Sequence, residues 1–124
     1  MNIELTLPFP PSVNSYYRCL GSRVVLSERG RKYKAEVRKI CQLAGWHNIG
    51  IAEPCEVHIV LRHNAPLRFD ADNRIKALLD ALEGGGVLDN DKWVWVVSAA
   101  KEQTPIGKSA VVRIFWGTKG QDYE

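Results

Sequence analysis

Alternating and clustered apolar positions predict four strands. Residues 2–7 alternate polar and apolar side chains, which is typical of a half-buried strand. Residues 55–63 are rich in β-branched and apolar side chains and predict a second strand. Residues 92–101 and 110–116 predict two more. We expect the last two to form an antiparallel hairpin across the short link between them.

Apolar residues at helical spacing predict two helices. The first runs from about residue 28 to residue 44, with Ser27 as its N-cap. The second begins near Asp70 or Ala71 and ends at the glycines of residues 84–86. Its core-facing stripe consists of Ile75, Leu78, Leu79 and Leu82.

The remaining N-terminal segment predicts a loop followed by a hairpin. Prolines end the first strand, because proline cannot donate to a sheet ladder, and a loop follows over residues 11–15. A turn near Gly21 leads into a second hairpin arm over residues 23–26. We therefore expect an α+β fold in which two main helices pack on a small mixed sheet. One domain would span residues 1–117, followed by a polar tail at residues 118–124.

Composition and cysteine usage exclude several classes of protein. The chain has 124 residues, 45% of them hydrophobic and 25% charged, which suits a single soluble domain. Cys19, Cys41 and Cys55 are odd in number and lack zinc-ligand spacing, so we expect structural, reduced thiols in the cytoplasm. No signal peptide is visible, and no apolar run approaches the about 20 residues of a membrane span. The net charge of +3 permits a polyanionic partner without requiring one.

The acidic residues around the second helix carry the most specific chemistry. Asp70 and Asp72 are separated by one residue, Lys76 follows Asp72 by four, and Asp91 precedes a predicted strand. Neighbouring carboxylates repel one another unless a cation holds them, and hard oxygen ligands suit Mg²⁺ or Mn²⁺. The spacing places Asp72 and Lys76 on one helical face, where a lysine can contact phosphate. The pattern indicates metal-assisted hydrolysis of a phosphodiester.

Simpler interpretations of these residues stay open. Asp70 can cap the helix, Asp72 can pair with Lys76 on the surface, and Asp91 can occupy a turn. An EF-hand loop is excluded, because its sixth and twelfth positions would be Ile75 and Ala81. The three consecutive glycines follow a helix and are not followed by Lys-Ser/Thr, so they do not form a phosphate loop.

Two surface features allow two interpretations each. The first helix carries basic residues on one side over residues 29–39, which is either a solvated face or a surface that follows a phosphate backbone. Trp93, Trp95 and Trp116 are spaced like strand residues, which more often belong to a core or an interface than to a base-stacking surface. Trp93 and Trp95 share a strand face by parity, which makes them a candidate dimer surface.

The acidic motif and the N-terminal segment together resemble the RusA family of Holliday junction resolvases. The string Asp70-x-Asp72-Asn73-x-x-Lys76, followed by a glycine-ended helix and Asp91, matches the spacing of that family. The segment Leu7-Pro8-Phe9-Pro10-Pro11-Ser12-x-Asn14-x-Tyr16-Tyr17-Arg18 is similar as well. The resemblance covers roughly residues 3–116. One departure is Asn90, which stands where the family usually has a first aspartate before Asp91, and Asp89 is the nearest replacement for that charge.

The resemblance implies a small homodimer that cuts four-way DNA junctions with Mg²⁺, or with Mn²⁺, in recombination and repair. It implies that Asp70, Asp72 and Asp91 bind metal and that Lys76 is needed for cleavage, by paired symmetric nicks. We expect no membrane association and no small-molecule cofactor. The candidate DNA contacts are Asn14, Tyr17, Arg18, Arg23, Arg31, Lys34, Arg68, Asn73 and Arg74. Two rival hypotheses are a non-catalytic branched-DNA-binding protein and a metal-dependent phosphoesterase for small substrates.

Overall fold

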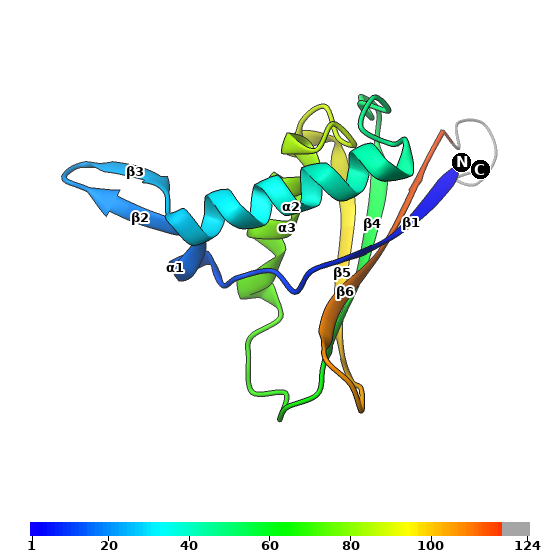
Figure 1. The fold of residues 1–124 in the computed structure, drawn as a ribbon. Helices are drawn as coiled ribbons and strands as arrows, with labels where there is room; N and C mark the ends of the chain where they lie inside the picture. The colour runs from blue at the N-terminus through cyan, green and yellow to red at the C-terminus, as the bar shows by residue number, and fades with distance from the viewer. Residues whose placement is uncertain (118–124) are drawn as a thin grey trace.

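A four-stranded sheet in the order β1-β6-β4-β5 carries the long helices on one face (Figure 1). The computed structural model describes residues 1–117, so the expected tail at residues 118–124 lies outside the described residues. The strands are β1 (Asn2–Leu7), β4 (Cys55–His63), β5 (Val94–Gln103) and β6 (Lys108–Trp116). In β1, β4 and β6, alternate residues are buried, as a strand with one covered face requires. The expected mixed α+β fold is confirmed.

The expected hairpin between the last two strands is wrong, because β4 lies between β5 and β6. β5 pairs with β4 in parallel, and β6 pairs with β4 antiparallel. The chain between β4 and β5 contains a helix, and such a crossover connection delivers a strand parallel to its neighbour. β4 therefore lies inside the sheet with a hydrogen-bonded partner on each edge, and Cys55, Val57, Ile59 and Leu61 on its covered face are almost completely buried.

The two predicted helices are confirmed as α2 (Glu28–Ala44) and α3 (Asp72–Gly84). Ser27 caps α2, since its side-chain oxygen accepts a hydrogen bond of 2.9 Å from the backbone N–H of Gly30. The buried faces of the two helices supply the core above the sheet. That face of α2 consists of Gly30, Tyr33, Val37 and Cys41. That face of α3 consists of Ala77, Leu78, Ala81 and Leu82.

The N-terminal segment contains one element that the sequence pattern missed. A short helix, α1 (Val13–Tyr16), stands where a loop was expected, and it places Tyr16 in the core. The predicted hairpin follows as β2 (Tyr17–Leu20) and β3 (Arg23–Leu26), and it projects from the body as an arm (Figure 1). A two-stranded sheet of this kind has little core of its own.

The structure confirms some of the smaller predictions for the tryptophans and cysteines and contradicts others. Trp93 belongs to a 3₁₀ turn, η1 (Asp91–Trp93), so it does not share a strand face with Trp95. Cys41 and Cys55 are buried as expected, whereas Cys19 is exposed on the arm. Among the described residues, none of the helices is long and apolar enough to cross a membrane.

Candidate functional site

Lys76 and Asp91 form the centre of the candidate site. Lys76 lies in the second turn of α3 and Asp91 opens η1, and their charged groups are 3.5 Å apart, from Nζ to Oδ2. Both side chains remain open to solvent, with exposed fractions of 56% and 41%. A partly exposed ion pair of this kind contributes little to the stability of the fold. Because both side chains are exposed, both charges remain accessible to a ligand.

Two contacts hold Asp91 in this position. The side chain of Asn90 accepts a hydrogen bond of 2.9 Å from the backbone N–H of Lys92 and so caps η1. Asn and Asp cap equally well, so the departure from the usual aspartate preserves this contact. The backbone N–H of Asp91 donates to Glu83 Oε1 at 3.2 Å, which ties η1 to the last turns of α3. Sequence reasoning missed Glu83, although its spacing of seven residues from Lys76 places both on one face of the helix.

Asp70 and Asp72 follow neither of the simpler interpretations. The N-cap residue of α3 is Ala71, and it makes no side-chain capping bond, so Asp70 does not cap the helix. Lys76 pairs with Asp91 rather than with Asp72. Within residues 1–117, neither the Asp70 nor the Asp72 carboxylate forms a hydrogen bond or an ion pair. Both side chains are exposed beside the start of α3, where the helix dipole favours negative charge.

The three aspartates supply the right donor chemistry for a hard cation without forming a closed ligand group. Carboxylate oxygens are the donors that Mg²⁺ and Mn²⁺ prefer. Among the described residues, however, no three His, Cys, Asp or Glu side chains are gathered closely enough to hold a metal ion. The structure therefore brings Asp91 to Lys76 but does not bring Asp70 and Asp72 into one group with it.

A second cluster lies one helical turn along α3. The hydroxyl of Tyr16 donates to Asp80 Oδ2, and Lys34 Nζ lies 3.7 Å from the same oxygen. Burial raises the pKa of the Tyr16 hydroxyl, and the Asp80 carboxylate raises it further. The cluster joins α1, α2 and α3, so it fixes the helix that carries Lys76.

Tyr17 packs edge-on against Tyr16 and is close enough to Asp80, Lys76 and Asp91 for their charges to act on it. Burial raises the pKa of Tyr17, the charge of Asp80 adds to the rise, and Lys76 opposes it. Asp91 also raises this pKa slightly, so the phenol is within electrostatic reach of both members of the pair. Tyr17 thus stands at the base of the arm, beside the candidate site.

Arg74 ties the proline-rich segment to α3. Its guanidinium donates to the backbone oxygen of Pro10 at 2.9 Å and lies 5.2 Å from the ring centre of Phe9 and 5.6 Å from that of Phe69. Burial lowers the pKa of Arg74, and the nearby Arg29 lowers it further. Arg74, which was predicted to contact DNA, therefore holds the proline-rich segment against the start of α3 in this structure.

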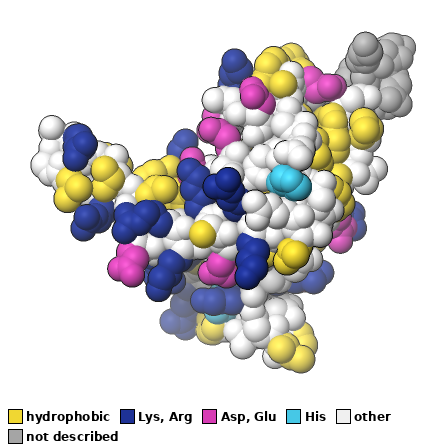
Figure 2. Space-filling view, turned by 45° about the horizontal axis from the view of Figure 1, so that its top comes forward, with side chains coloured by type: hydrophobic (Ala, Val, Ile, Leu, Met, Phe, Trp, Pro, Cys, Tyr) yellow, Lys and Arg dark blue, Asp and Glu magenta, His cyan; other side chains and the backbone are white. Residues whose placement is uncertain are grey.

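The other candidate DNA contacts are distributed over the arm and the helices. Asn14, Arg18, Arg23, Arg31 and Arg68 are exposed, whereas Asn73 and Lys34 are half-buried. The hairpin register places Arg18 and Arg23 on the same face of the arm, opposite Cys19 and Val24. Figure 2 shows Lys and Arg side chains gathered over the middle of the molecule and along the arm at the left.

Comparison with known proteins identifies the family. The family described as Endodeoxyribonuclease RusA matches residues 8–114. The crossover junction endodeoxyribonuclease rusA of Enterobacteria phage HK97 is 33% identical over 91 residues, which are 72% of this chain and 73% of that protein. The proteins named crossover junction endodeoxyribonuclease RusA from Escherichia coli and Shigella sonnei are each 38% identical over 91 residues, covering 73% of this chain and 75% of theirs. The chain belongs to the RusA family of endodeoxyribonucleases.

Proposed function

We propose that this protein is a Mg²⁺-dependent endonuclease that resolves four-way DNA junctions by paired symmetric nicks. Membership of the RusA family supports an endodeoxyribonuclease, and the names of its relatives supply the crossover junction as substrate. The observation that carries the proposal within this chain is the Lys76–Asp91 pair, beside a helix start where two aspartates have no partner among residues 1–117.

We assign Lys76 and Asp91 separate roles in phosphodiester cleavage, and their geometry supports the assignment. The Asp91 carboxylate pairs with the Lys76 ammonium and holds it at the surface. From there the ammonium can donate a hydrogen bond to a non-bridging oxygen of the scissile phosphate. That donor stabilises the negative charge that develops on the phosphate in the transition state. Asn90 and Glu83 fix the backbone around Asp91, so the pair is oriented before DNA binds.

Asp70, Asp72 and Asp91 are the residues that would hold Mg²⁺ or Mn²⁺. When bound, the ion supplies an activated water and neutralises phosphate charge. Because these carboxylates do not form a closed group, we propose that the DNA phosphate completes the site. Mg²⁺ is commonly bound by one or two carboxylates together with substrate phosphates, so a site that closes only on DNA suits this cation.

We further propose that the chain acts as a homodimer through the edge strand β5. Among the described residues this strand pairs with β4 on one side only, and its residues from Val94 to Ala100 carry no charge. Trp95, Val96 and Val97 are exposed by 72%, 44% and 42%. Long, uncharged edge strands readily pair with another strand. A two-fold pairing would supply two equivalent sites for two strands of a junction.

The second candidate function is a branched-DNA-binding protein without catalysis. The lack of a closed three-carboxylate group among the described residues is the observation that favours it. This alternative predicts that EDTA leaves junction binding unchanged and that no branched DNA yields a product.

A cleavage assay separates the two functions. Junction, linear duplex and nucleotide substrates are incubated with the protein, with Mg²⁺ and with EDTA. We expect symmetric nicks in the junction with Mg²⁺ only, and no hydrolysis of duplex or nucleotides. Junction binding without any cleavage product would contradict the nuclease and support the binding protein.

A further inference from the structure

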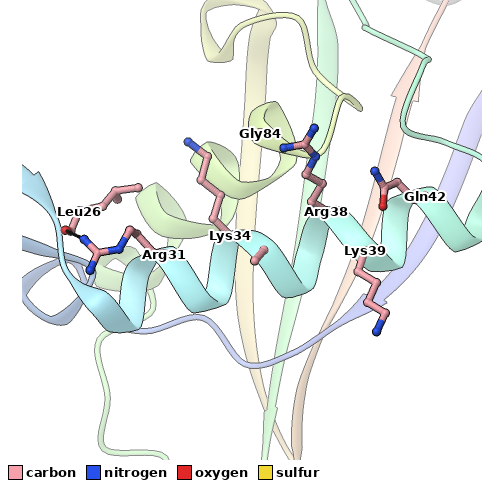
Figure 3. Close-up of a pocket in the computed structure, with 8 residues that line it drawn as sticks. Leu26, Arg31, Lys34, Arg38, Lys39, Gln42 and Gly84 are labelled. Carbon is pink, nitrogen blue, oxygen red and sulfur yellow. Dashed lines mark hydrogen bonds between the residues drawn. The ribbon is translucent and has the colours of Figure 1, made fainter.

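A basic groove runs between α2 and the end of α3, away from the Lys76–Asp91 pair. It encloses about 500 Å³ and is shown in Figure 3. Its wall contains four basic side chains and no acidic or aromatic side chain. The lining residues are Leu26, Arg31, Lys34, Ala35, Arg38, Lys39, Gln42 and Gly84.

The cations of the groove are held in different ways. Arg31 donates to the backbone oxygen of Leu26 at 3.0 Å, which orients its guanidinium at the arm end of the groove. In Figure 3, Lys34 and Arg38 extend to the α3 side of α2, whereas Lys39 points to the other side. Arg38 is exposed and forms no hydrogen bond or ion pair within residues 1–117. Arg38 is therefore a charge that nothing in the described chain neutralises.

The absence of a side chain at Gly84 makes room for the stem of Lys34. A Cβ at this position would lie 2.4 Å from Lys34 Cε, so the lysine stem lies directly across the end of α3. Lys34 then reaches Asp80 at 3.7 Å, one turn after Lys76 on the same helix. Lys76, Asp80 and Gly84 are spaced four residues apart and share one face of α3. The groove thus lies on the same side of α3 as the candidate site, about 12 Å along that helix from Lys76.

We infer that this groove binds the phosphate backbone of one duplex arm of the junction, an inference that rests on the proposed function. Arg31, Lys34 and Arg38 span about 10 Å of helix, which is long enough to reach successive phosphates of one strand. Single-strand sites add aromatic side chains on which bases stack, and the groove has none. Its contacts are therefore to backbone alone, so the groove holds an arm and does not recognise the branch point.

The test compares binding to a four-way junction and to a linear duplex with the sequence of one arm. Affinities are measured in EDTA by fluorescence anisotropy over a range of NaCl concentrations. Arg38→Gln should weaken both complexes by the same factor and lower the salt slope by about 1, as expected for one lost phosphate contact. Arg62→Gln is the matched control, because Arg62 lies on the sheet, outside the groove, and pairs with Glu102 at 2.7 Å.

A second variant changes the charge of the groove without weakening the fold. Ala35 is exposed in the groove between Arg31 and Arg38, so Ala35→Glu adds helical ion pairs that maintain stability. The same change should weaken binding to both DNAs more than Arg38→Gln does, because it places a negative charge against phosphate.

Three results would overturn the inference. They are an unchanged salt slope in Arg38→Gln, an equal loss in Arg62→Gln, or a loss confined to the junction. Failure of the proposed function has a different signature. Wild-type protein would then show no preference for the junction over the duplex and no cleavage with Mg²⁺, whereas the response of duplex binding to Arg38→Gln would still decide the role of the groove.

Discussion

Lys76 and Asp91 show how a single pair can serve a site without stabilising the fold. Their 3.5 Å contact is exposed, so its contribution to folding is small, and its effect is to orient the ammonium. The sequence correctly placed Asp72 and Lys76 on one helical face, but it offered the wrong partner for the lysine. The partner depends on η1, whose position follows from the contact between Glu83 and the Asp91 backbone.

Glu83 positions Asp91 through its backbone N–H, and we expect its loss to slow junction cleavage. Glu83→Ala removes the acceptor for the Asp91 N–H, so kcat for junction cleavage should fall about five- to tenfold with little change in KM. Glu83→Gln keeps an acceptor oxygen and should restore kcat. Single-turnover cleavage at saturating protein measures the effect, and equal rates for wild type and Glu83→Ala would refute this role.

The elements follow from local sequence signals more reliably than their pairing does. Ser27 and the apolar spacing sufficed to place α2, because capping and periodicity are properties of a short window. α1 escaped prediction, since a helix of this length has no periodic pattern, and it forms because Tyr16 is buried against Asp80. The insertion of β4 between β5 and β6 depends on hydrogen bonding between strands that are distant in the sequence, which no local signal encodes.

Gly30 tests the packing between α1 and α2. Replacing glycine by alanine inside a helix normally stabilises it by about 1 kcal/mol. At this site the added Cβ would lie 2.3 Å from the backbone oxygen of Tyr16, so we expect Gly30→Ala to destabilise the protein by about 1–3 kcal/mol. Urea unfolding measures the change.

The control for this prediction is Gly45→Ala. Gly45 has a φ of 78° and no atom within 4 Å of a built Cβ, so this change introduces backbone strain without a clash. The expected loss is about 1 kcal/mol. A Gly30→Ala protein at least as stable as wild type would show that α1 and α2 are not packed as closely as described.

At the scale of the whole molecule, the sheet and the arm leave apolar surface uncovered. In the part of the chain that the structure describes, β5 forms an open edge, and the arm exposes Leu20 and Val24 by 42% and 65%. On the face shown in Figure 2, Lys and Arg side chains gather over the middle of the molecule and on the arm, and four of them line the groove between α2 and the end of α3. A dimer through β5 would extend the sheet across both copies and leave the helix-covered face free for DNA.

Trp95→Lys tests this assembly. A lysine on the open edge opposes strand pairing, and Trp95 is 72% exposed, so the monomer should lose little stability. Sedimentation equilibrium should report a dimer for wild type and a monomer for the variant, which should then produce single nicks in place of paired nicks. A dimeric Trp95→Lys protein would place the interface elsewhere.

The most direct test of the central claim is cleavage of a synthetic four-way junction by Asp72→Asn with Mg²⁺. Asp72 is exposed and has no partner within residues 1–117, so the change should not affect folding. Glu4→Gln, at the far edge of the sheet, is the control and should cut normally. The account predicts that Asp72→Asn binds the junction as tightly as wild type or more tightly, because a negative charge is removed, and does not cut it. Cleavage at the wild-type rate would contradict the account.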